Sequence, residues 1–400
     1  MVSEKMLSLG SNRSTIRELF EYGKMRAAQV GAENIYDYSL GNPSVPTPQA
    51  VNDALVEIIK NDPPIAVHGY TSAVGDNDTR DAIADNLNRR FGTAFTRDNL
   101  YLTCGAAASL LCAYRAVIID ENSEIIGIAP YFPEYEAFVN SNGGKFKMIP
   151  ADEEHFQIKF DLLENAINVN TQAVIINTPN NPSGVVYSEK TIIKLAEILK
   201  RKSEELGHTI YLISDEPYRE LVYTEIGVPF TAKYYNNTIV CYSYSKSLSL
   251  PGERIGYILI PSEADNFTEL YNAIAGAGRS CGYVCAPSLM QKMIAKCADV
   301  MPDISSYKKN RDYLYNALTE IGYECADPSG AFYLFVKAPN GSADEFSEIA
   351  KKYDLLLVSG SAFGCPSFFR ASYCVDYDMI VRSIPAFKKA YEDAVNNEND

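Results

Sequence analysis

The stretch "SYSKSLSLPGERIGY" (residues 243–257) decides the fold, because it places one lysine and one arginine at the end of an apolar run. Lys246 lies among four serines, and Arg254 follows eight residues later, after a Gly-Glu turn and before a second apolar run. The preceding run, "TIVCYS" (238–243), is typical of a buried strand. Lys246 is therefore expected in a loop directly after a strand.

Similar apolar runs recur from about residue 98 to 260, and helical patterns separate several of them, notably 105–118 and 188–207. The strand candidates are 99–103, 124–129, 145–150, 172–177, 209–214 and 238–243. Strands that are apolar along their whole length, with helices between them, indicate a largely parallel sheet covered on both faces. The sequence therefore predicts an α/β fold.

The pattern changes after about residue 290. Helices are expected over 302–320, 342–352 and 377–395, and strands over 330–339, 354–360 and 367–375. This mixture predicts a smaller α+β domain. The N-terminal segment holds a helix and the turn-rich "SLGNPSVPTP" (39–48), which could pack on either domain. We predict a large domain over 50–289 and a small domain formed by 1–49 and 290–400.

The composition is that of a soluble globular protein, with 46% hydrophobic and 22% charged residues in a chain of 400. A formal net charge of −15 argues against nucleic acid as a partner, since both would be negative. No apolar run reaches the length of a membrane span, and the start "MVSEKMLSLG" lacks the features of a signal peptide. We therefore expect neither a nucleic-acid nor a membrane partner.

Cysteine and histidine usage indicates a cytoplasmic protein without a metal centre. The nine cysteines are scattered and form no C-x-x-C pair, which is typical of reduced thiols in the cytosol. The three histidines, His68, His155 and His208, are far apart in sequence and show no metal-ligand spacing.

Ligands of open parallel sheets bind beyond the carboxyl ends of the strands, so the residues after each strand are the site candidates. Polar or special residues follow strand after strand: Gly105-Ala106-Ala107, "PYFPEY" (130–135), "TPNNPSG" (178–184), "DEPY" (215–218) and "YSK" (244–246). Because the carboxyl ends of parallel strands meet at one edge of a sheet, these five loops predict a single site.

Lys246 is the nucleophile candidate at this site. A lysine held among apolar groups and near another cation loses its proton more readily, which frees the amine to form a Schiff base. A lone lysine of this kind is more often a surface loop residue. Ser243, Ser245 and Arg254 favour the catalytic interpretation, because hydroxyls and a guanidinium bind phosphate.

Gly105, Ala106 and Ala107 open a helix after a strand, so their backbone N–H groups can form a second anion site. Small residues at a helix start also serve close packing. Two phosphate-type elements beside a Schiff-base lysine predict a cofactor that carries both an aldehyde and a phosphate. Pyridoxal 5′-phosphate has both groups.

Further residues suit this cofactor. Asp215 ends the run "YLISD" and could pair with the ring nitrogen, which must be protonated for the ring to withdraw electrons, although helix capping is an equally good interpretation. Tyr218 and Asn181 could hydrogen-bond the 3′ oxygen of the ring. Phe132, in a proline-rich turn, could stack on the ring or serve as a core aromatic.

The order and spacing of "NTPNNPSG", "DEPY", "SYSK" with "RIGY", and "FFRAS" resemble the class I/II aminotransferases of the fold-type I superfamily, over roughly residues 36–375. The resemblance implies a large domain with a mixed, mostly parallel sheet between helices and a smaller α+β domain. It also implies a PLP-dependent enzyme of amino acid metabolism that moves an amino group between an L-amino acid and a 2-oxo acid by a ping-pong mechanism. The aspartate/2-oxoglutarate pair is one such substrate pair.

The resemblance implies a role for each matching residue around the cofactor. Lys246 would hold the cofactor covalently and move the proton at the substrate's α-carbon. Asp215 would pair with the ring nitrogen, and Asn181 and Tyr218 would bind the 3′ oxygen. The phosphate would be bound by Ser243, Ser245, Arg254 and the backbone of Gly105, Ala106 and Ala107.

Substrate binding and assembly are implied in the same way. Arg370, helped by Gly41, would hold the substrate's α-carboxylate as a bidentate fork. Tyr70 would reach the phosphate of the neighbouring subunit, so a homodimer with shared sites is expected. Some aspartate-specific relatives have a lysine at the position of Ala107, and others an arginine from the partner subunit near the position of Arg279. Because alanine cannot bind a carboxylate and Arg279 could equally lie on the surface, the substrate stays open.

Three other functions compete. Ser243-x-x-Lys246 matches the nucleophile motif of serine β-lactamases, but the Ser-Asp-Asn and Lys-Thr-Gly that these need are absent. A PLP-dependent carbon–sulfur β-lyase would use the same lysine, aspartate and arginine. A non-catalytic aminotransferase-like binding domain of a transcription regulator would usually follow a DNA-binding module. Only about 35 residues precede the fold here, the charge is negative, and Lys246 is present.

Overall fold

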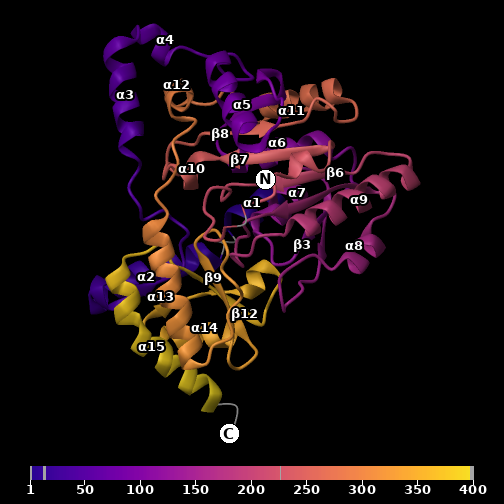
Figure 1. The fold of residues 1–400 in the computed structure, drawn as a ribbon. Helices are drawn as coiled ribbons and strands as arrows, with labels where there is room; N and C mark the ends of the chain where they lie inside the picture. Colours follow the sequence, from indigo (N-terminus) through magenta and orange to yellow (C-terminus); the bar gives the residue numbers. More distant parts are fainter. Residues whose placement is uncertain (1, 12–14, 226, 397–400) are drawn as a thin grey trace.

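A seven-stranded sheet forms the centre of the computed structural model, which describes residues 2–11, 15–225 and 227–396 (Figure 1). Its strand order is β2-β8-β7-β6-β5-β3-β4. The strands are β2 (Leu100–Thr103), β3 (Glu124–Ile128), β4 (Lys145–Ile149), β5 (Thr171–Asn177), β6 (Tyr211–Asp215), β7 (Thr238–Ser243) and β8 (Gly256–Leu259). The six strand candidates are confirmed to within two residues at each end.

The sheet is mixed but mostly parallel, as predicted. The strands β3 to β7 pair in parallel with one another, whereas β8 is antiparallel to both of its neighbours, β2 and β7. Because β8 reverses direction between them, β2 and β7 point the same way. The carboxyl ends of all strands except β8 therefore lie at one edge of the sheet.

Helices cover both faces of the sheet, because successive residues of each strand point to opposite sides. In β5, Ala173 and Ile175 pack in one core with α6 (Ala106–Val117), α7 (Glu134–Ser141) and α11 (Phe267–Cys281). Val174 and Ile176 pack in a second core with α8 (Phe160–Ala166) and α9 (Glu189–Leu206). A third core joins β2, β7 and β8 to α3 (Gln49–Asn61), α5 (Asn77–Phe91) and α12 (Ser288–Cys297).

Local sequence signals set the ends of the longest of these helices. Ser188 caps α9, since its side chain accepts a hydrogen bond from the backbone N–H of Thr191. Gly207 ends the helix in the left-handed conformation, with φ of 74°. The predicted helix over 188–207 is confirmed between these two caps.

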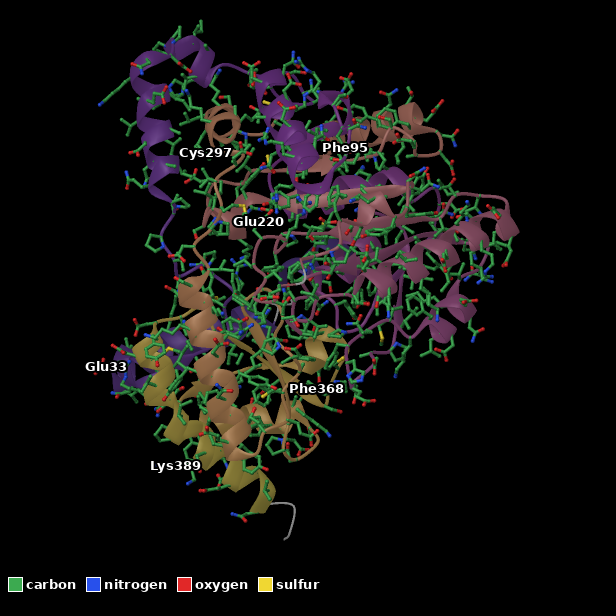
Figure 2. All side chains as sticks on the ribbon, in the orientation of Figure 1. Glu33, Phe95, Glu220, Cys297, Phe368 and Lys389 are labelled. Atoms are coloured by element: carbon green, nitrogen blue, oxygen red, sulfur yellow. The ribbon has the colours of Figure 1, made fainter. Side chains whose placement is uncertain are left out.

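The C-terminal part of the chain forms a separate layer below the main sheet in Figure 1. An antiparallel sheet of order β11-β12-β9 packs with three helices. The elements are α13 (Ser305–Ile321), β9 (Tyr333–Lys337), α14 (Ala343–Lys351), β11 (Val358–Ser359), β12 (Phe368–Ser372) and α15 (Tyr377–Asn396). In Figure 2, Phe368 lies among these strands, whereas Phe95 and Cys297 lie in the upper part.

The N-terminal segment packs on this C-terminal layer. Strand β1 (Tyr36–Asp37) pairs in parallel with β10 (Leu355–Leu356), and Leu19 of α2 (Thr15–Val30) shares a core with Phe335. One helix was expected in this segment, but two are present, because α1 (Glu4–Ser11) precedes α2. No residue of α1 is buried, whereas α2 buries Leu19 and Gly23.

The two-domain division stays a prediction. Its boundary at residue 289 falls within α12, whose Met293 and Ile294 share the core of α3 and α5 in the upper part. Within the described residues, no helix is both long and apolar enough to cross a membrane.

Candidate active site

A cavity of about 300 Å³ opens at the carboxyl edge of the main sheet, where the C-terminal layer meets it. Loops after β2, β3, β5, β6 and β7 all contribute to it. The lining residues are Ile16, Gly41, Ala106, Ala107, Leu110, Phe132, Asn177, Asn181, Asp215, Pro217, Tyr218, Ser243, Ser245, Lys246, Pro251, Arg254, Tyr333 and Arg370. The structure thus brings together in one cavity most of the residues that the sequence marked as site candidates.

Lys246 enters the cavity from α10 (Tyr244–Ser247), the single helical turn that follows β7. Its Nζ donates a hydrogen bond to the backbone oxygen of Gly41 at 2.6 Å. Burial, together with the nearby cations Arg370 and Arg254, lowers the pKa of Lys246 from 10.5 to about 8, although Cys374 opposes the shift. A substantial share of the amine is therefore neutral near physiological pH and able to act as a nucleophile.

Hydroxyl groups and a guanidinium gather next to this lysine. Ser243 caps α10: its Oγ accepts from the backbone N–H of Ser245 at 3.1 Å and donates to Ser245 Oγ at 2.8 Å. Arg254 Nη1 donates to the backbone oxygen of Pro251 at 3.0 Å and lies 3.5 Å from Ser245 Oγ. Arg254 adopts φ of 52°, an uncommon backbone conformation that often marks functional positions.

Gly105 brings the start of α6 against this guanidinium. Its φ is 85°, and a Cβ atom there would lie 2.8 Å from Arg254 Nη2. Only glycine combines that backbone conformation with such a close approach. The free N–H groups at the start of α6 and the Arg254 side chain thus face the same space, which suits a phosphate.

Asp215 ends β6 and is 5% exposed. Its Oδ2 accepts a hydrogen bond from the hydroxyl of Tyr135 at 2.5 Å, and its Oδ1 is buried with no partner among the described residues. Burial raises the pKa of Asp215 to about 7, against the lowering effect of Tyr135. An unpaired buried carboxylate oxygen calls for a donor from a ligand, and a protonated ring nitrogen is such a donor.

Arg370 closes the cavity from β12. It is 2% exposed, and its guanidinium donates to Asn181 Oδ1 at 2.9 Å and to the backbone oxygen of Ser39 at 2.5 Å. Among the described residues its Nε has no hydrogen-bond partner, and its two other contacts are with an amide and a backbone oxygen rather than a carboxylate. Tyr333 lies under the guanidinium, with 4.6 Å from Cζ to the ring centroid, and shares a hydrogen bond with Tyr218. A buried, unpaired guanidinium suits the carboxylate of a substrate.

Three predicted site residues do not line this cavity: Gly105, which directly precedes the lining residue Ala106, and Tyr70 and Arg279. Tyr70 is 89% exposed, and Arg279 is an exposed residue near the end of α11. Neither lines the cavity of its own chain. Their assigned tasks in a neighbouring subunit therefore stay predictions.

The sequence interpretation missed several lining residues. Asn177 donates from its side chain to the backbone oxygen of Asp215 at 2.8 Å and accepts from the backbone N–H of Asn181 at 2.7 Å, so it ties two site loops together. Its place at the end of "QAVIIN" could have marked it. Tyr135 does not line the cavity but contacts Asp215, and its place within the quoted "PYFPEY" could have marked it. The lining residues Ile16 and Leu110 carry no comparable signal.

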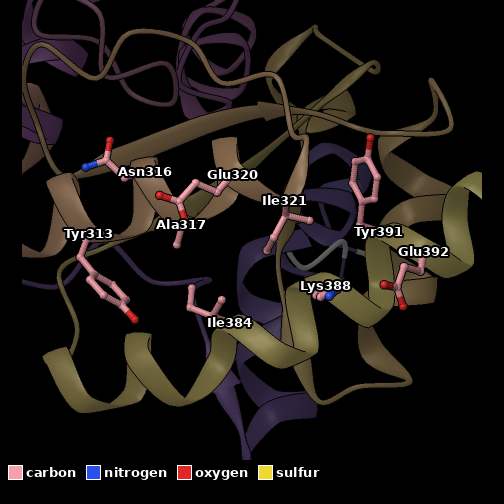
Figure 3. Close-up of a pocket in the computed structure, with 9 residues that line it drawn as sticks. All are labelled: Tyr313, Asn316, Ala317, Glu320, Ile321, Ile384, Lys388, Tyr391 and Glu392. Atoms are coloured by element: carbon pink, nitrogen blue, oxygen red, sulfur yellow. The ribbon is translucent and has the colours of Figure 1, made fainter.

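A larger hollow, of about 760 Å³, lies between α13 and α15 on the outside of the C-terminal layer (Figure 3). Tyr313 and Ile384 line it from facing helices, but its charged groups, Glu320, Lys388 and Glu392, are all exposed. Exposed charges have no special reactivity, so we place the chemistry at the sheet edge. Among the described residues, no group of three or more histidines, cysteines and carboxylates could hold a metal ion.

The residues at the sheet edge fit pyridoxal 5′-phosphate. The unpaired Oδ1 of Asp215 suits the ring nitrogen, the Gly105–Arg254 cradle suits the phosphate, and the buried amine of Lys246 suits the aldehyde. The three groups line or border one cavity, so a single ligand can reach all of them.

Comparisons with known proteins agree with this geometry. The family model "Aminotransferase class I and II" matches residues 32–384. The solved structure of an "Amino Transferase" from Eubacterium rectale is 60% identical, covers 98% of this chain and 99% of its own, and superposes with a TM-score of 0.97.

More distant relatives have named activities. A "Probable aspartate/prephenate aminotransferase" from Aquifex aeolicus is 26% identical over 92% of this chain and 94% of its own length. An "Aromatic-amino-acid aminotransferase 2" from Thermococcus litoralis is 27% identical over 96% of each chain. The relatives thus differ in the amino acid that they are named for.

Proposed function

The chain belongs to the class I and II aminotransferase family, and from this we propose that it is a PLP-dependent enzyme that moves an amino group between an L-amino acid and a 2-oxo acid by a ping-pong mechanism. The observation that carries the proposal is the convergence of Lys246, Asp215 and Arg370 on one cavity. These three groups supply a nucleophilic amine, a partner for a ring nitrogen and a carboxylate-binding fork.

Bound pyridoxal 5′-phosphate supplies an electron sink for the pair of electrons left when the substrate's α-proton is removed. Ser243, Ser245, Arg254 and the start of α6 would hold its phosphate. Asp215 Oδ1 would accept a hydrogen bond from the ring nitrogen, Asn181 and Tyr218 would bind the 3′ oxygen, and Phe132 would stack on the ring. These contacts orient the cofactor before any substrate enters.

Lys246 has two tasks. Its amine would hold the cofactor's aldehyde covalently in the resting enzyme, and as a base it would take up the proton from the substrate's α-carbon. The lowered pKa suits both, because the neutral amine is a nucleophile and a base. Arg370 holds the substrate's α-carboxylate, so that the α-proton faces Lys246. The first substrate leaves as a 2-oxo acid before the second one enters.

A single-donor experiment tests this proposal. The purified enzyme is mixed with alanine, aspartate or phenylalanine without any 2-oxo acid, and the absorbance of the bound cofactor and the released product are measured. We expect a spectral change and one equivalent of 2-oxo acid per site with a good donor, and neither in Lys246→Ala. Continuous release of ammonia and a 2-oxo acid from a β-thioether amino acid would instead indicate the carbon–sulfur β-lyase. No spectral change and no released 2-oxo acid with any donor would favour the non-catalytic binding domain.

We propose further that acidic donors of the aspartate type depend on Arg279 from a second copy of the chain. The cavity is lined by three cations, Lys246, Arg254 and Arg370, and each already has a task. Ala107 offers no charge, so a distal carboxylate needs a fourth cation. Arg279→Ala should lower kcat/KM for aspartate and glutamate and spare alanine and phenylalanine. Equal losses for all donors, or none for any, would contradict this idea.

We also propose that the enzyme is a homodimer, lies in the cytoplasm and acts in amino acid metabolism. Tyr70 and Ile65 are 89% and 86% exposed, and apolar side chains so open to solvent favour an interface. All nine cysteines are free, which supports a reducing compartment.

A further inference from the structure

We propose that Tyr135 is a positioning residue for the transfer reaction, because it orients the Asp215 carboxylate so that one oxygen faces the ring nitrogen of the cofactor. This inference rests on the proposed function. It assigns a task to a side chain that lines neither the cavity nor the substrate path.

Tyr135 makes the one side-chain hydrogen bond that the Asp215 carboxylate receives from the described residues, at 2.5 Å to Oδ2. The tyrosine is 1% exposed. Asn177 also contacts Asp215, but it donates to the backbone oxygen. The orientation of the carboxylate about its terminal bond is therefore set by Tyr135, and the other oxygen, Oδ1, is left unpaired.

Two residues at the start of α7 would serve the cofactor. Phe132 precedes α7 and lines the cavity, and Tyr135 lies in the first turn of α7. The two rings meet edge to face, with centroids 5.6 Å apart. The start of α7 therefore fixes both the residue expected on the ring face and the donor to the ring's counter-ion.

The hydrogen bond also favours the ionised form of Asp215. The pKa of this carboxyl is raised to about 7, because burial and the nearby Glu216 raise it more than the hydrogen bond from Tyr135 lowers it. The other titratable groups that face Asp215 are Tyr114, Cys241 and Tyr218, from α6, β7 and the loop after β6. All three are neutral at pH 7, because burial raises their pKa values above their ordinary range. Without Tyr135 the proton would therefore move from the ring nitrogen toward Asp215.

The chain offers a matched control. Tyr114 is also fully buried next to Asp215, but its hydroxyl has no hydrogen-bond partner in the part of the chain that the structure describes. Tyr114→Phe and Tyr135→Phe each remove one buried hydroxyl near the same carboxylate. Only the second removes a bond to it.

The test uses the holoenzyme loaded with cofactor that is labelled with ¹⁵N in the ring. The ¹⁵N chemical shift reports whether the ring nitrogen is protonated, and a single-turnover reaction with the best donor reports the transfer rate. We expect a protonated ring nitrogen in the wild type and in Tyr114→Phe. In Tyr135→Phe we expect a shift toward the unprotonated value and a rate loss of about 10- to 100-fold, as for one lost hydrogen bond to a charged group.

A second substitution separates the hydrogen bond from the packing. Replacement of Tyr135 by 3-fluorotyrosine keeps the shape of the side chain and makes its hydroxyl a stronger donor. The ring nitrogen should then stay protonated and the rate should stay near that of the wild type. Thermal melting of each variant checks that it is folded.

Three outcomes would overturn the inference: a wild-type ¹⁵N shift in Tyr135→Phe, an equal loss in Tyr114→Phe, or a loss with 3-fluorotyrosine as large as with phenylalanine. The proposed function fails in a different way, since the wild type itself would then release no 2-oxo acid from any donor.

Discussion

Lys246 has a buried amine whose one hydrogen-bond partner, among the described residues, is the backbone oxygen of Gly41. Burial and the two nearby arginines lower its pKa, and Cys374 opposes them. A neutral amine at moderate pH follows directly from this arrangement. The same environment would be costly for a lysine without a chemical task.

We predict that the apoenzyme captures pyridoxal 5′-phosphate covalently with a pH midpoint near 8. Only the neutral amine attacks the aldehyde, and the pKa of Lys246 is lowered from 10.5 to about 8, so capture should rise as pH passes through 8. Borohydride trapping followed by peptide mapping measures it, with Lys246→Ala as the control. A midpoint near 10.5, or an adduct on another lysine, would contradict the role of Lys246.

Arg370→Lys should weaken every donor by a similar factor. Lysine keeps the charge but loses the fork that donates to Asn181 and Ser39, and a lost charge-assisted contact costs about 2–3 kcal/mol, or about 30- to 150-fold in kcat/KM. A panel of alanine, aspartate and phenylalanine measures the factor. A primary amine without a carboxylate is the internal control and should lose little. Losses that depend strongly on the donor's side chain would refute a common α-carboxylate site.

The sequence predicted which residues form the site, but not the hydrogen bonds that position them. Lys246, Asp215 and Arg370 carry charge at strand ends, where chemistry is expected, and the structure places all three in one cavity. The hydrogen bond from Tyr135 to Asp215 joins residues 80 positions apart, so it depends on how α7 packs against β6. Spacing alone cannot give such a contact.

At the scale of elements, the close approach of the start of α6 to Arg254 depends on Gly105. Gly105→Ala would introduce a Cβ atom 2.8 Å from Arg254 Nη2 at φ of 85°. We expect it to weaken cofactor binding at least tenfold, since a positive φ alone costs about 1–2 kcal/mol and the arginine must also move. Equilibrium dialysis of pyridoxal 5′-phosphate measures the affinity.

Gly276→Ala in α11 is the control for this change. A Cβ atom at Gly276 would meet nothing within 4 Å, and alanine is the better helix former by about 0.5–1 kcal/mol. It should leave cofactor affinity unchanged and raise the melting temperature slightly. Unchanged affinity in Gly105→Ala would show that the start of α6 does not form the phosphate site.

Most strands of the main sheet were predictable because they are continuous apolar runs, although Lys145 and Lys147 interrupt the pattern in β4. The order of the strands was not predictable. Strand β8 lies between β2 and β7 and runs antiparallel to both, although β2 precedes it by more than 150 residues. Gly256 allows this placement, since a Cβ atom there would lie 2.3 Å from the backbone oxygen of Tyr242. Pairings of such long range arise from packing of the whole sheet, which no local pattern encodes.

At the scale of the whole molecule, Tyr70 does not line the cavity of its own chain. It is 89% exposed and outside the cavity, yet the segment around it is held in place, since Gln291 of α12 donates to the Thr71 hydroxyl at 2.9 Å. An exposed aromatic residue on a fixed segment favours contact with a second copy. If that contact reaches the partner's phosphate site, each cavity needs residues from both chains.

Subunit mixing tests this shared site. Tyr70→Ala should weaken cofactor binding and lower activity at limiting pyridoxal 5′-phosphate, and Lys246→Ala should be inactive. In a mixed dimer, the cavity that keeps Lys246 receives Tyr70 from the other chain and is intact. The second cavity lacks both Lys246 and Tyr70.

Mixing the two variants should therefore raise activity above that of Tyr70→Ala alone, toward half of the wild-type value per dimer. If Tyr70 acted within its own chain, no mixed dimer would contain an intact cavity. No gain on mixing, or wild-type behaviour of Tyr70→Ala, would rule out the shared site.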